Sequence, residues 1–391
     1  MLLLFYIICL ILQLQYKNLR QMIKQLIKKA ATCGPVRKAG LTVFRCFPDL
    51  AARYCIRQEC KPLRAEAEKF FAQPDLSLPE GASREDYFDA LKKHGVSLSE
   101  YFHQYEFYTK NEEERSEFIS RAHMRGLALK LRMMFLDYDN IGLLRDKERF
   151  FAHYSPLGFC HRKWLYAPNA TYEEFVQLVS STNCVMKPHD TSLGAGIVKL
   201  NKTQDGPELR ALYDKCVAQK ALIEEFIQGS EAIQAFHPSS LNTIRFDTIA
   251  FGGKAVAFGA FVRMGMGDMI IDNAHSGGIF AQINIKTGII ESEGITVDGM
   301  RVNVHPDSQK TIMGFQMPHW DEIVEFCLSA ARQTKNIRTG WDVVETIDGQ
   351  LEMIEANSRP DIDVLQSPLQ IGIKRKVLDT LTELTGRKIT I

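Results

Sequence analysis

The most informative stretch of this sequence is WDVVETIDGQLEMIEAN, residues 341–357. Two β-rich runs flank the dipeptide Asp348-Gly349, which is typical of a two-residue hairpin turn. That register places Asp342 directly opposite Glu355, with their Cβ atoms only about 5 Å apart. Asn357 lies two residues beyond Glu355 and therefore shares its face of the strand.

Two opposed carboxylates destabilise a hairpin unless a cation lies between them. With Asn357 they form a set of hard oxygen ligands, without imidazole or thiolate, which suits Mg²⁺ and, as the alternative, Mn²⁺. The predicted metal ligands are therefore Asp342, Glu355 and Asn357. The same register pairs Glu345 with Glu352 on the other face, so an exposed polar hairpin with chance pairing stays open as an alternative.

Two further hairpins are predicted upstream of this one. Their turns are Gly252-Gly253 and Thr287-Gly288, each between β-rich runs. Three antiparallel hairpins within a short length predict one large antiparallel sheet. The expected strands cover residues 243–250, 255–262, 279–285, 289–293, 341–346 and 350–356, with a helix at 321–334.

A second candidate site precedes these hairpins. Residues 183–188 and 197–200 read as strands, and the loop between them, 189–196, contains Ser192 and Gly194. Such a loop closes over phosphates, because backbone N–H groups approach the oxygens where side chains are small, and Lys187 adds a positive charge. An ordinary hairpin loop is the alternative, since the Walker A pattern is absent.

Composition narrows the class of protein. The 391 residues include 48 basic and 47 acidic side chains, so there is no basic footprint for nucleic acid. The nine cysteines form no CxxC pair, which favours a reducing cytoplasm over a disulfide framework. The length is sufficient for two or three lobes with their own cores.

The N-terminal segment, residues 1–30, has its own character. Residues 1–12 are apolar but too few to span a bilayer, and the flanking pattern of a secretory signal is missing. A basic stretch with helical spacing follows, which suits peripheral contact with an anionic membrane at the inner face. A buried helix and a mis-assigned start are the other two interpretations.

The remaining chain divides by pattern into three parts. Residues 31–140 are charged and periodic, which predicts a mainly helical region. From about Leu144 onward, short β-rich runs alternate with turns and helical patches, an α+β signature. We expect two α+β lobes there, a smaller one at 141–230 and a larger one at 231–391.

The order of these motifs resembles the ATP-grasp superfamily. The order is Asp146-Lys147, Lys187-Pro188 with its glycine loop, residues 224–231 (EEFIQGSE), residues 242–246 (NTIRF), and the hairpin at 341–357. It is most similar to the sugar-transfer-associated ATP-grasp proteins of bacterial surface-polysaccharide biosynthesis. The resemblance implies two α+β lobes whose antiparallel sheets clasp ATP, preceded here by the helical region.

The resemblance also implies roles for individual residues. Lys147 and Lys187 correspond to the two lysines that contact ATP phosphates, with Ser192 and Gly194 in the flap between the strands. By the same resemblance, Glu224 would contact the adenine amino group, and the backbone of Phe226 and Ile227 would bind the edge of the ring. Glu231 would bind the ribose hydroxyls.

A catalytic arginine is expected as well. D-alanine–D-alanine-type ligases often carry it two residues before the first metal aspartate, but Gly340 occupies that position here. Arg245 or Arg263 must then stabilise the transferred phosphoryl group. A three-residue turn that includes Lys254 puts both arginines on one face, and we favour it over a two-residue turn, which separates them.

The activity that the resemblance implies is an ATP-dependent carboxylate–amine or carboxylate–thiol ligase that forms an acylphosphate. The expected partners are ATP, small carboxylates and amine or sugar-linked substrates, with Asp272, Asn273 and His275 on the acceptor side. A phosphotransferase and a non-catalytic nucleotide-binding scaffold of a polysaccharide assembly complex are the alternatives.

Overall fold

The computed structural model describes residues 47–136, 141–188, 196–202, 207–269, 272, 277–296 and 298–391. The N-terminal segment 1–30 lies outside these residues, as does most of the loop 189–196. Within the described residues, no helix combines the length and the apolar character needed to cross a membrane.

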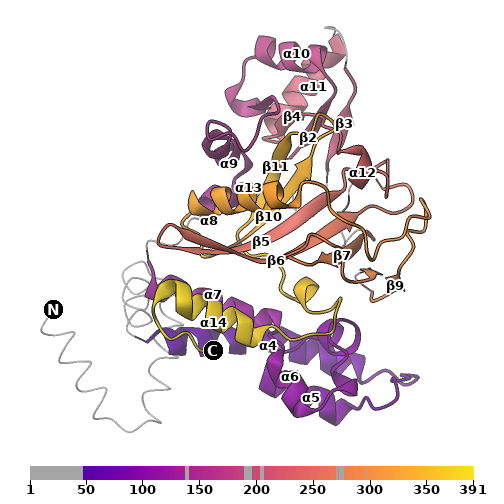
Figure 1. The fold of residues 1–391 in the computed structure, drawn as a ribbon, viewed down its shortest axis with the longest axis vertical. Coiled ribbons are helices and arrows are strands. Elements are labelled where there is room, and N and C mark those ends of the chain that lie inside the picture. The colour runs from indigo at the N-terminus through magenta and orange to yellow at the C-terminus, as the bar shows by residue number, and fades with distance from the viewer. Residues whose placement is uncertain are drawn as a thin grey trace, which may run out of the picture.

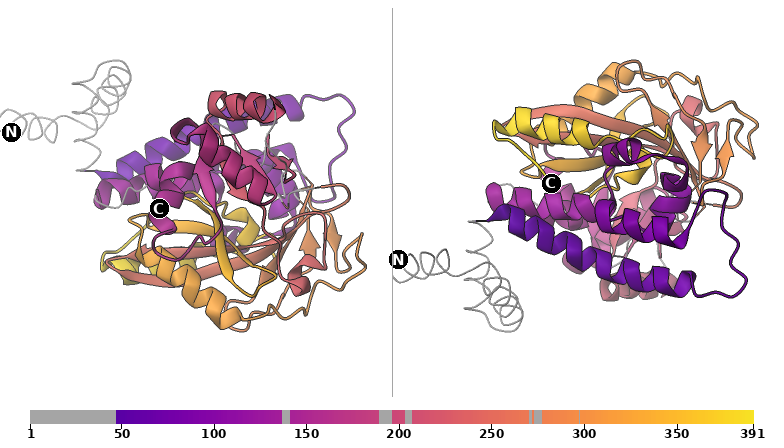
Figure 2. Two further views of the ribbon diagram at one scale, coloured as in Figure 1. Left: turned by 90° about the horizontal axis from the view of Figure 1, so that it is seen from above. Right: turned by 90° about the horizontal axis from the view of Figure 1, so that it is seen from below.

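The helical region precedes both sheets, as the sequence predicts (Figure 1). Caps define its helices: the Ser83 hydroxyl accepts from Asp86 N at 3.0 Å, and Gly95 ends the same helix in the left-handed conformation. Its elements are α4 (Pro48–Phe70), α5 (Arg84–His94), η1 (Glu100–Gln104), η2 (Phe107–Thr109), α6 (Glu112–Glu117) and α7 (Arg121–Met134). Seen from below, α4 and α7 run side by side (Figure 2).

Two short helices lead into a small antiparallel sheet of order β1-β4-β2-β3. A capping box between Thr171 and Glu174 begins the helix that follows its first strand. The elements are α8 (Ile141–Arg145), α9 (Lys147–Tyr154), β1 (Trp164–Tyr166), η3 (Ala167–Asn169), α10 (Tyr172–Ser181), β2 (Cys184–Lys187), β3 (Val198–Leu200), α11 (Pro207–Ala218) and β4 (Leu222–Glu225).

The large sheet is antiparallel with the order β11-β10-β5-β6-β7-β8-β9. Its elements are α12 (Glu231–Gln234), β5 (Thr243–Phe251), β6 (Lys254–Met264), β7 (Ile279–Ile283), β8 (Gly294–Ile295), β9 (Arg301–Val302), α13 (Trp320–Arg332), β10 (Arg338–Glu345), β11 (Leu351–Asn357), η5 (Asp363–Leu365) and α14 (Lys374–Thr385). The predicted second strand of the middle hairpin, 289–293, is wrong, because that segment forms only isolated bridges at Ile289 and Ile290.

Helices cover both faces of the large sheet (Figure 1). On one face α13 and α9 pack against Phe246 and Trp341. On the other face α7 and α14 pack against Phe261 and Phe280. The helical region is therefore joined to the same sheet face that carries the ionic cluster described next.

Candidate functional site

One face of the large sheet carries a cluster of four charged side chains from four neighbouring strands. Asp342 of β10 is fully buried and accepts hydrogen bonds from Arg245 Nη2 at 2.9 Å and Arg263 Nη2 at 2.8 Å. The Arg245 Nε also donates to this carboxylate. Glu355 of β11 lies directly opposite Asp342.

A β-bulge produces the pairing of Asp342 with Glu355. The predicted two-residue turn is wrong, because Glu345 pairs with Leu351 and the backbone N–H of Thr346 donates to Gln350 O at 2.8 Å. The register then shifts next to Asp342, and the extra residue restores the predicted opposition of the carboxylates. The predicted pairing of Glu345 with Glu352 is wrong for the same reason.

A second bulge places the two arginines on one face. The turn between β5 and β6 contains only Gly252-Gly253, so the favoured three-residue turn is wrong. The register shifts between Asp247 and Thr248, and beyond the shift Arg263 lies opposite Thr243. Arg245 and Arg263 therefore share a face despite the short turn.

Gly340 leaves room for the side-chain stem of Arg245. A Cβ atom there would lie 2.8 Å from the Pro360 Cβ, 2.9 Å from Asp247 Oδ1 and 3.0 Å from Arg245 Cδ. The stem of Arg245 thus passes over the backbone of Gly340. A side chain two positions before Asp342 would therefore collide with the stem of Arg245.

The pKa values of Asp342 and Glu355 are shifted in opposite directions. Burial alone would raise the pKa of Asp342, but Arg245 and Arg263 hold it well below its usual value. The pKa of Glu355 is raised by desolvation and by the negative charge of Asp342. Because Glu355 is exposed at the surface of the sheet, the negative charge of Asp342 directly opposite is the cause that accounts for this direction.

Asn357 lies beside Glu355, with its Nδ2 3.4 Å from Glu355 Oε1. Among the described residues, no group of three histidine, cysteine, aspartate or glutamate side chains is arranged to hold a metal. The donor set here is two carboxylates and an amide. That chemistry fits Mg²⁺, which usually takes one or two protein carboxylates and completes its shell with phosphate and water.

Asp272 lies beside Arg263 at the edge of the ionic cluster. It is buried, accepts a hydrogen bond from Thr243 N at 2.9 Å, and lies 3.5 Å from Arg263 Nε. Burial raises its pKa, although Arg263 opposes this. Asp272, one of the predicted acceptor-side residues, thus contacts Thr243 of β5 and Arg263 of β6. The neighbouring candidates Asn273 and His275 lie outside the described residues.

The small sheet carries a second buried ionic cluster. Glu224 of β4 is 3% exposed and forms ion pairs with Lys187 of β2 and with Arg162, whose Nε lies 2.9 Å from Glu224 Oε2. Burial would raise the pKa of Glu224, but Arg162 and Lys187 outweigh it and lower the value. Both Glu224 oxygens are thus engaged by cations.

Arg162 is a central residue that the sequence analysis missed. It also pairs with Glu352 of β11 and donates to the carbonyl oxygen of Met353 at 2.9 Å. It therefore ties the strand of Glu224 to the strand of Glu355. An isolated arginine in the loop before β1 follows no recognisable motif, so only the assembled fold reveals it.

The other nucleotide-side candidates are spread around this cluster. Lys147 is the first residue of α9, and its Nζ donates to Pro188 O at 3.2 Å, next to Lys187. Phe226 donates its backbone N–H to Asn183 O, and Ile227 follows it. Glu231 is exposed at the start of α12. Ser192 and Gly194 lie outside the described residues.

A family model for sugar-transfer-associated ATP-grasp proteins matches residues 157–381. This match spans both sheets and every residue of the two ionic clusters. The chain belongs to this ATP-grasp family. The ATP-grasp fold and the helical region that precedes it are as the sequence analysis predicted.

Solved structures with a similar fold are distant in sequence. The ATP-grasp ligase PsnB, complexed with minimal precursor, shares 14% identity at a TM-score of 0.41, covering 70% of this chain and 71% of that one. D-alanyl-alanine synthetase A from Vibrio cholerae shares 11% at 0.39, with 62% and 64% covered. An L-amino acid ligase from Bacillus licheniformis shares 14% at 0.36, with 60% and 48% covered. No curated protein matches this ATP-grasp chain.

Proposed function

We propose that this chain is an ATP- and Mg²⁺-dependent carboxylate–amine ligase, or a carboxylate–thiol ligase, that acts through an acylphosphate. The observation that carries the proposal is the opposed pair Asp342 and Glu355, flanked on the same sheet face by Arg245 and Arg263. Opposed carboxylates beside two arginines suit a site where a negatively charged phosphoryl group is held and transferred.

The proposed ATP site lies between this cluster and the small sheet. Lys147 and Lys187 would contact the phosphates under the loop 189–196. The strand end after Glu224 would receive the adenine ring through the backbone of Phe226 and Ile227. Membership of the ATP-grasp family supports this assignment, as does the Arg162 bridge between β4 and β11. Glu231 is the proposed ribose ligand.

The proposed reaction has two steps. A substrate carboxylate oxygen attacks the γ-phosphorus of ATP, so that a new O–P bond forms, the bond to the β-phosphate oxygen breaks and ADP leaves. An amine then attacks the acyl carbon, a C–N bond forms, phosphate leaves and the amine loses a proton. Arg245 and Arg263 offset the charge that develops on the transferring group.

Asp342, Glu355 and Asn357 would hold the metal. When bound, Mg²⁺ supplies positive charge against the phosphate oxygens. The Asp342 carboxylate already accepts hydrogen bonds from two arginines. The side-chain oxygens of Glu355 and Asn357 are therefore the ones most available to coordinate the metal. Mn²⁺ is the alternative ion.

The proposed setting is the bacterial cytoplasm, in the synthesis of a surface polysaccharide or a sugar conjugate. The described cysteines are free thiols, which agrees with a reducing compartment. The family description names sugar transfer, and this supports sugar-linked substrates. We also propose that residues 1–30 contact the membrane surface.

Hydroxylamine trapping tests the ligase proposal. The protein is incubated with ATP, Mg²⁺, hydroxylamine and a panel of amino acids and sugar acids, and ADP and hydroxamate are quantified. We expect both products in equal amounts with one class of carboxylate, and loss of both in Glu355→Gln but not in the exposed control Glu208→Gln. ADP release with a stable phosphorylated product would favour a phosphotransferase. Nucleotide binding without any turnover would favour a scaffold.

A further inference from the structure

Two buried histidines lie side by side next to the segment 265–267, which follows β6. They are His237, after α12, and His305, after β9, and their ring centres are 6.0 Å apart. His237 Nε2 lies 2.9 Å from the carbonyl oxygen of Gly267. His305 Nε2 lies 2.9 Å from the carbonyl oxygen of Gly265. Because a carbonyl oxygen can only accept a hydrogen bond, both Nε2 atoms carry a proton.

The side-chain amide of Asn242 has a single orientation that its neighbours allow. Its Nδ2 lies 3.0 Å from the carbonyl oxygen of Ile233 and 3.1 Å from that of His237, and both oxygens require a donor. Its Oδ1 therefore faces the backbone N–H of Gly265 at 3.3 Å and the hydroxyl oxygen of Ser240 at 3.0 Å. Since an amide oxygen can only accept, the hydroxyl proton of Ser240 is donated to Asn242.

The Nδ1 atoms of the two histidines have different partners. The Ser240 hydroxyl oxygen lies 2.8 Å from His237 Nδ1, and its single proton already goes to Asn242, so His237 Nδ1 must be the donor. His305 Nδ1 instead accepts the backbone N–H of Asp307 at 3.3 Å. Burial lowers the pKa of His305, which agrees with a neutral ring. The hydrogen bonds thus require two protons on His237 and one on His305.

This network joins the beginning of β5 to the end of β6. Asn242 directly precedes Thr243 of β5, and Gly265 directly follows β6. Arg263 of β6 donates to Thr243 Oγ1 at 2.7 Å and to Asp342 at 2.8 Å. The hydrogen bonds of the histidine and of the amide therefore hold the two strand ends between which this guanidinium lies.

We propose that His237 is doubly protonated and that it is a positioning residue for Arg263 in the ionic cluster of the large sheet. The partner for its charge is Asp307, whose Oδ2 lies 3.8 Å from His237 Nε2 and accepts the Gly267 N–H at 2.7 Å. A buried charge is tolerated where it has an ionic partner and where its donors are hydrogen-bonded. The described titratable groups that face His237 are Asp307 and the neutral His305. The positioning role rests on the proposed ligase function, in which Arg263 contacts the transferred phosphoryl group.

Long-range proton–nitrogen NMR of the full chain, labelled at histidine, counts the protons on each ring, because protonated and bare nitrogens differ in chemical shift. At about pH 7.5, above the ordinary histidine pKa of about 6.5, we expect two protonated nitrogens for His237 and one for His305. The variants His237→Gln and His305→Gln assign the two rings by the loss of their signals. A bare nitrogen on His237 at this pH would overturn the assignment.

Ser240→Ala tests the same proton from its acceptor, and it also covers the case in which His237→Gln does not fold. Without the hydroxyl oxygen, the Nδ1 proton of His237 has no acceptor. His237 should then show one bare nitrogen at the same pH, while the signals of His305 stay as in the wild type. Two protonated nitrogens on His237 in Ser240→Ala would contradict the hydrogen-bond pattern on which the inference depends.

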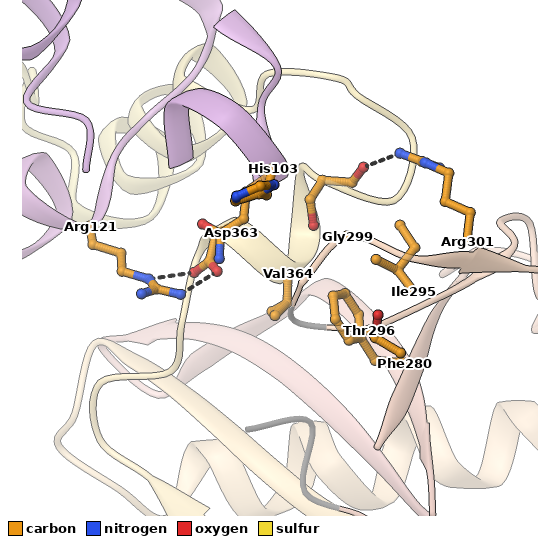
Figure 3. A pocket seen from close by; sticks show the side chains of 11 residues that line it. His103, Arg121, Phe280, Ile295, Thr296, Gly299, Arg301, Asp363 and Val364 are labelled. Atoms are coloured by element: carbon orange, nitrogen blue, oxygen red, sulfur yellow. Dashed lines mark hydrogen bonds and ion pairs between the residues drawn. The ribbon is translucent and has the colours of Figure 1, made fainter. Parts of the chain in front are cut away.

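ADP release in the hydroxylamine assay and AMPPNP titration measure the positioning role. We expect kcat for ADP release to fall about tenfold or more in His237→Gln, with unchanged AMPPNP affinity, because a small displacement of a catalytic group slows a reaction strongly. The matched control is His103→Gln, at an exposed histidine of η1 that lines a small cavity beside η5 (Figure 3). It should release ADP as the wild type does. Unchanged ADP release in His237→Gln would overturn the positioning role.

The charge of His237 and the ligase function can fail separately. If the wild type releases no ADP with any carboxylate while His237 carries two protons, the proposed ligase function falls and the charge assignment stands. If the wild type releases ADP and His237 has a bare nitrogen, only the inference about His237 falls.

Discussion

Asp342 and Glu355 lie directly opposite each other on β10 and β11, yet Arg245 and Arg263 both form ion pairs with Asp342. The consequence is a lowered pKa for Asp342 and a raised pKa for Glu355. Glu355 is therefore the carboxylate that gains most from a bound cation.

Removing the charge of Glu355 should stabilise the metal-free protein at neutral pH. Because its folded-state pKa is raised, the folded state disfavours the ionised carboxylate, and stability is lost as pH rises through that pKa. In Mg²⁺-free buffer at neutral pH, the free energy of unfolding of Glu355→Gln should exceed that of the wild type by up to about 1 kcal/mol. This is the cost of an opposed like-charge pair. The difference should vanish below the ordinary pKa of 4.5.

Urea denaturation across this pH range measures the effect, with Glu208→Gln as the exposed control. A wild type more stable than Glu355→Gln at neutral pH without Mg²⁺ would show that the carboxylate pair carries no repulsion. Added Mg²⁺ should stabilise the wild type and leave Glu355→Gln nearly unchanged.

Adding one methyl group at Gly340 should displace Arg245. The new Cβ would meet Pro360, Asp247 and the Arg245 stem at 3.0 Å or less. We expect Gly340→Ala to lose about 1–3 kcal/mol of stability through overpacking and to consume ATP more slowly. Gly142→Ala is the matched control, because its Cβ would meet only Arg149 Nη1, at 3.5 Å. Equal stability of the two variants would contradict the close packing at Gly340.

Substitution of Arg162 should lower the free energy of unfolding more than substitution of an exposed arginine does. Its side chain is 2% exposed, and Arg162→Met leaves Glu224 and Glu352 buried without this partner. Breaking such a pair costs about 3–5 kcal/mol. The exposed pair of Arg332 with Glu325 is the matched control, and Arg332→Met should cost less than about 1 kcal/mol.

Chemical denaturation of both arginine variants makes the comparison. The double variant Arg162→Met/Glu352→Gln should recover part of the loss, because it removes one of the uncompensated charges. Similar costs for Arg162→Met and Arg332→Met would mean that Arg162 does not join β4 to β11.

The sequence predicted more of the strands than of their registers. The glycine turns and β-rich runs located β5, β6, β10 and β11 to within a few residues. The predicted helix 321–334 corresponds to α13, whose cap at His319 begins it slightly earlier. Helical periodicity likewise indicated the helical region. These features depend on local pattern, which the sequence contains.

The parts that could not be predicted depend on tertiary packing. Both bulges change register without any local signal, yet they bring Arg263 and Glu355 into the cluster. Arg162 belongs to no motif, and its importance follows from the two strands, β4 and β11, that it joins. The burial of Asp272 against Thr243 likewise follows from packing that no local pattern indicates.

Calorimetric titration of AMPPNP, with and without Mg²⁺, measures whether the opposed carboxylates of β10 and β11 hold the metal together with the phosphates. We expect Mg²⁺ to strengthen binding about tenfold or more in the wild type and in Glu208→Gln. This gain should disappear in Glu355→Gln. Equal affinity for AMPPNP in all three proteins, whether or not Mg²⁺ is present, would contradict it.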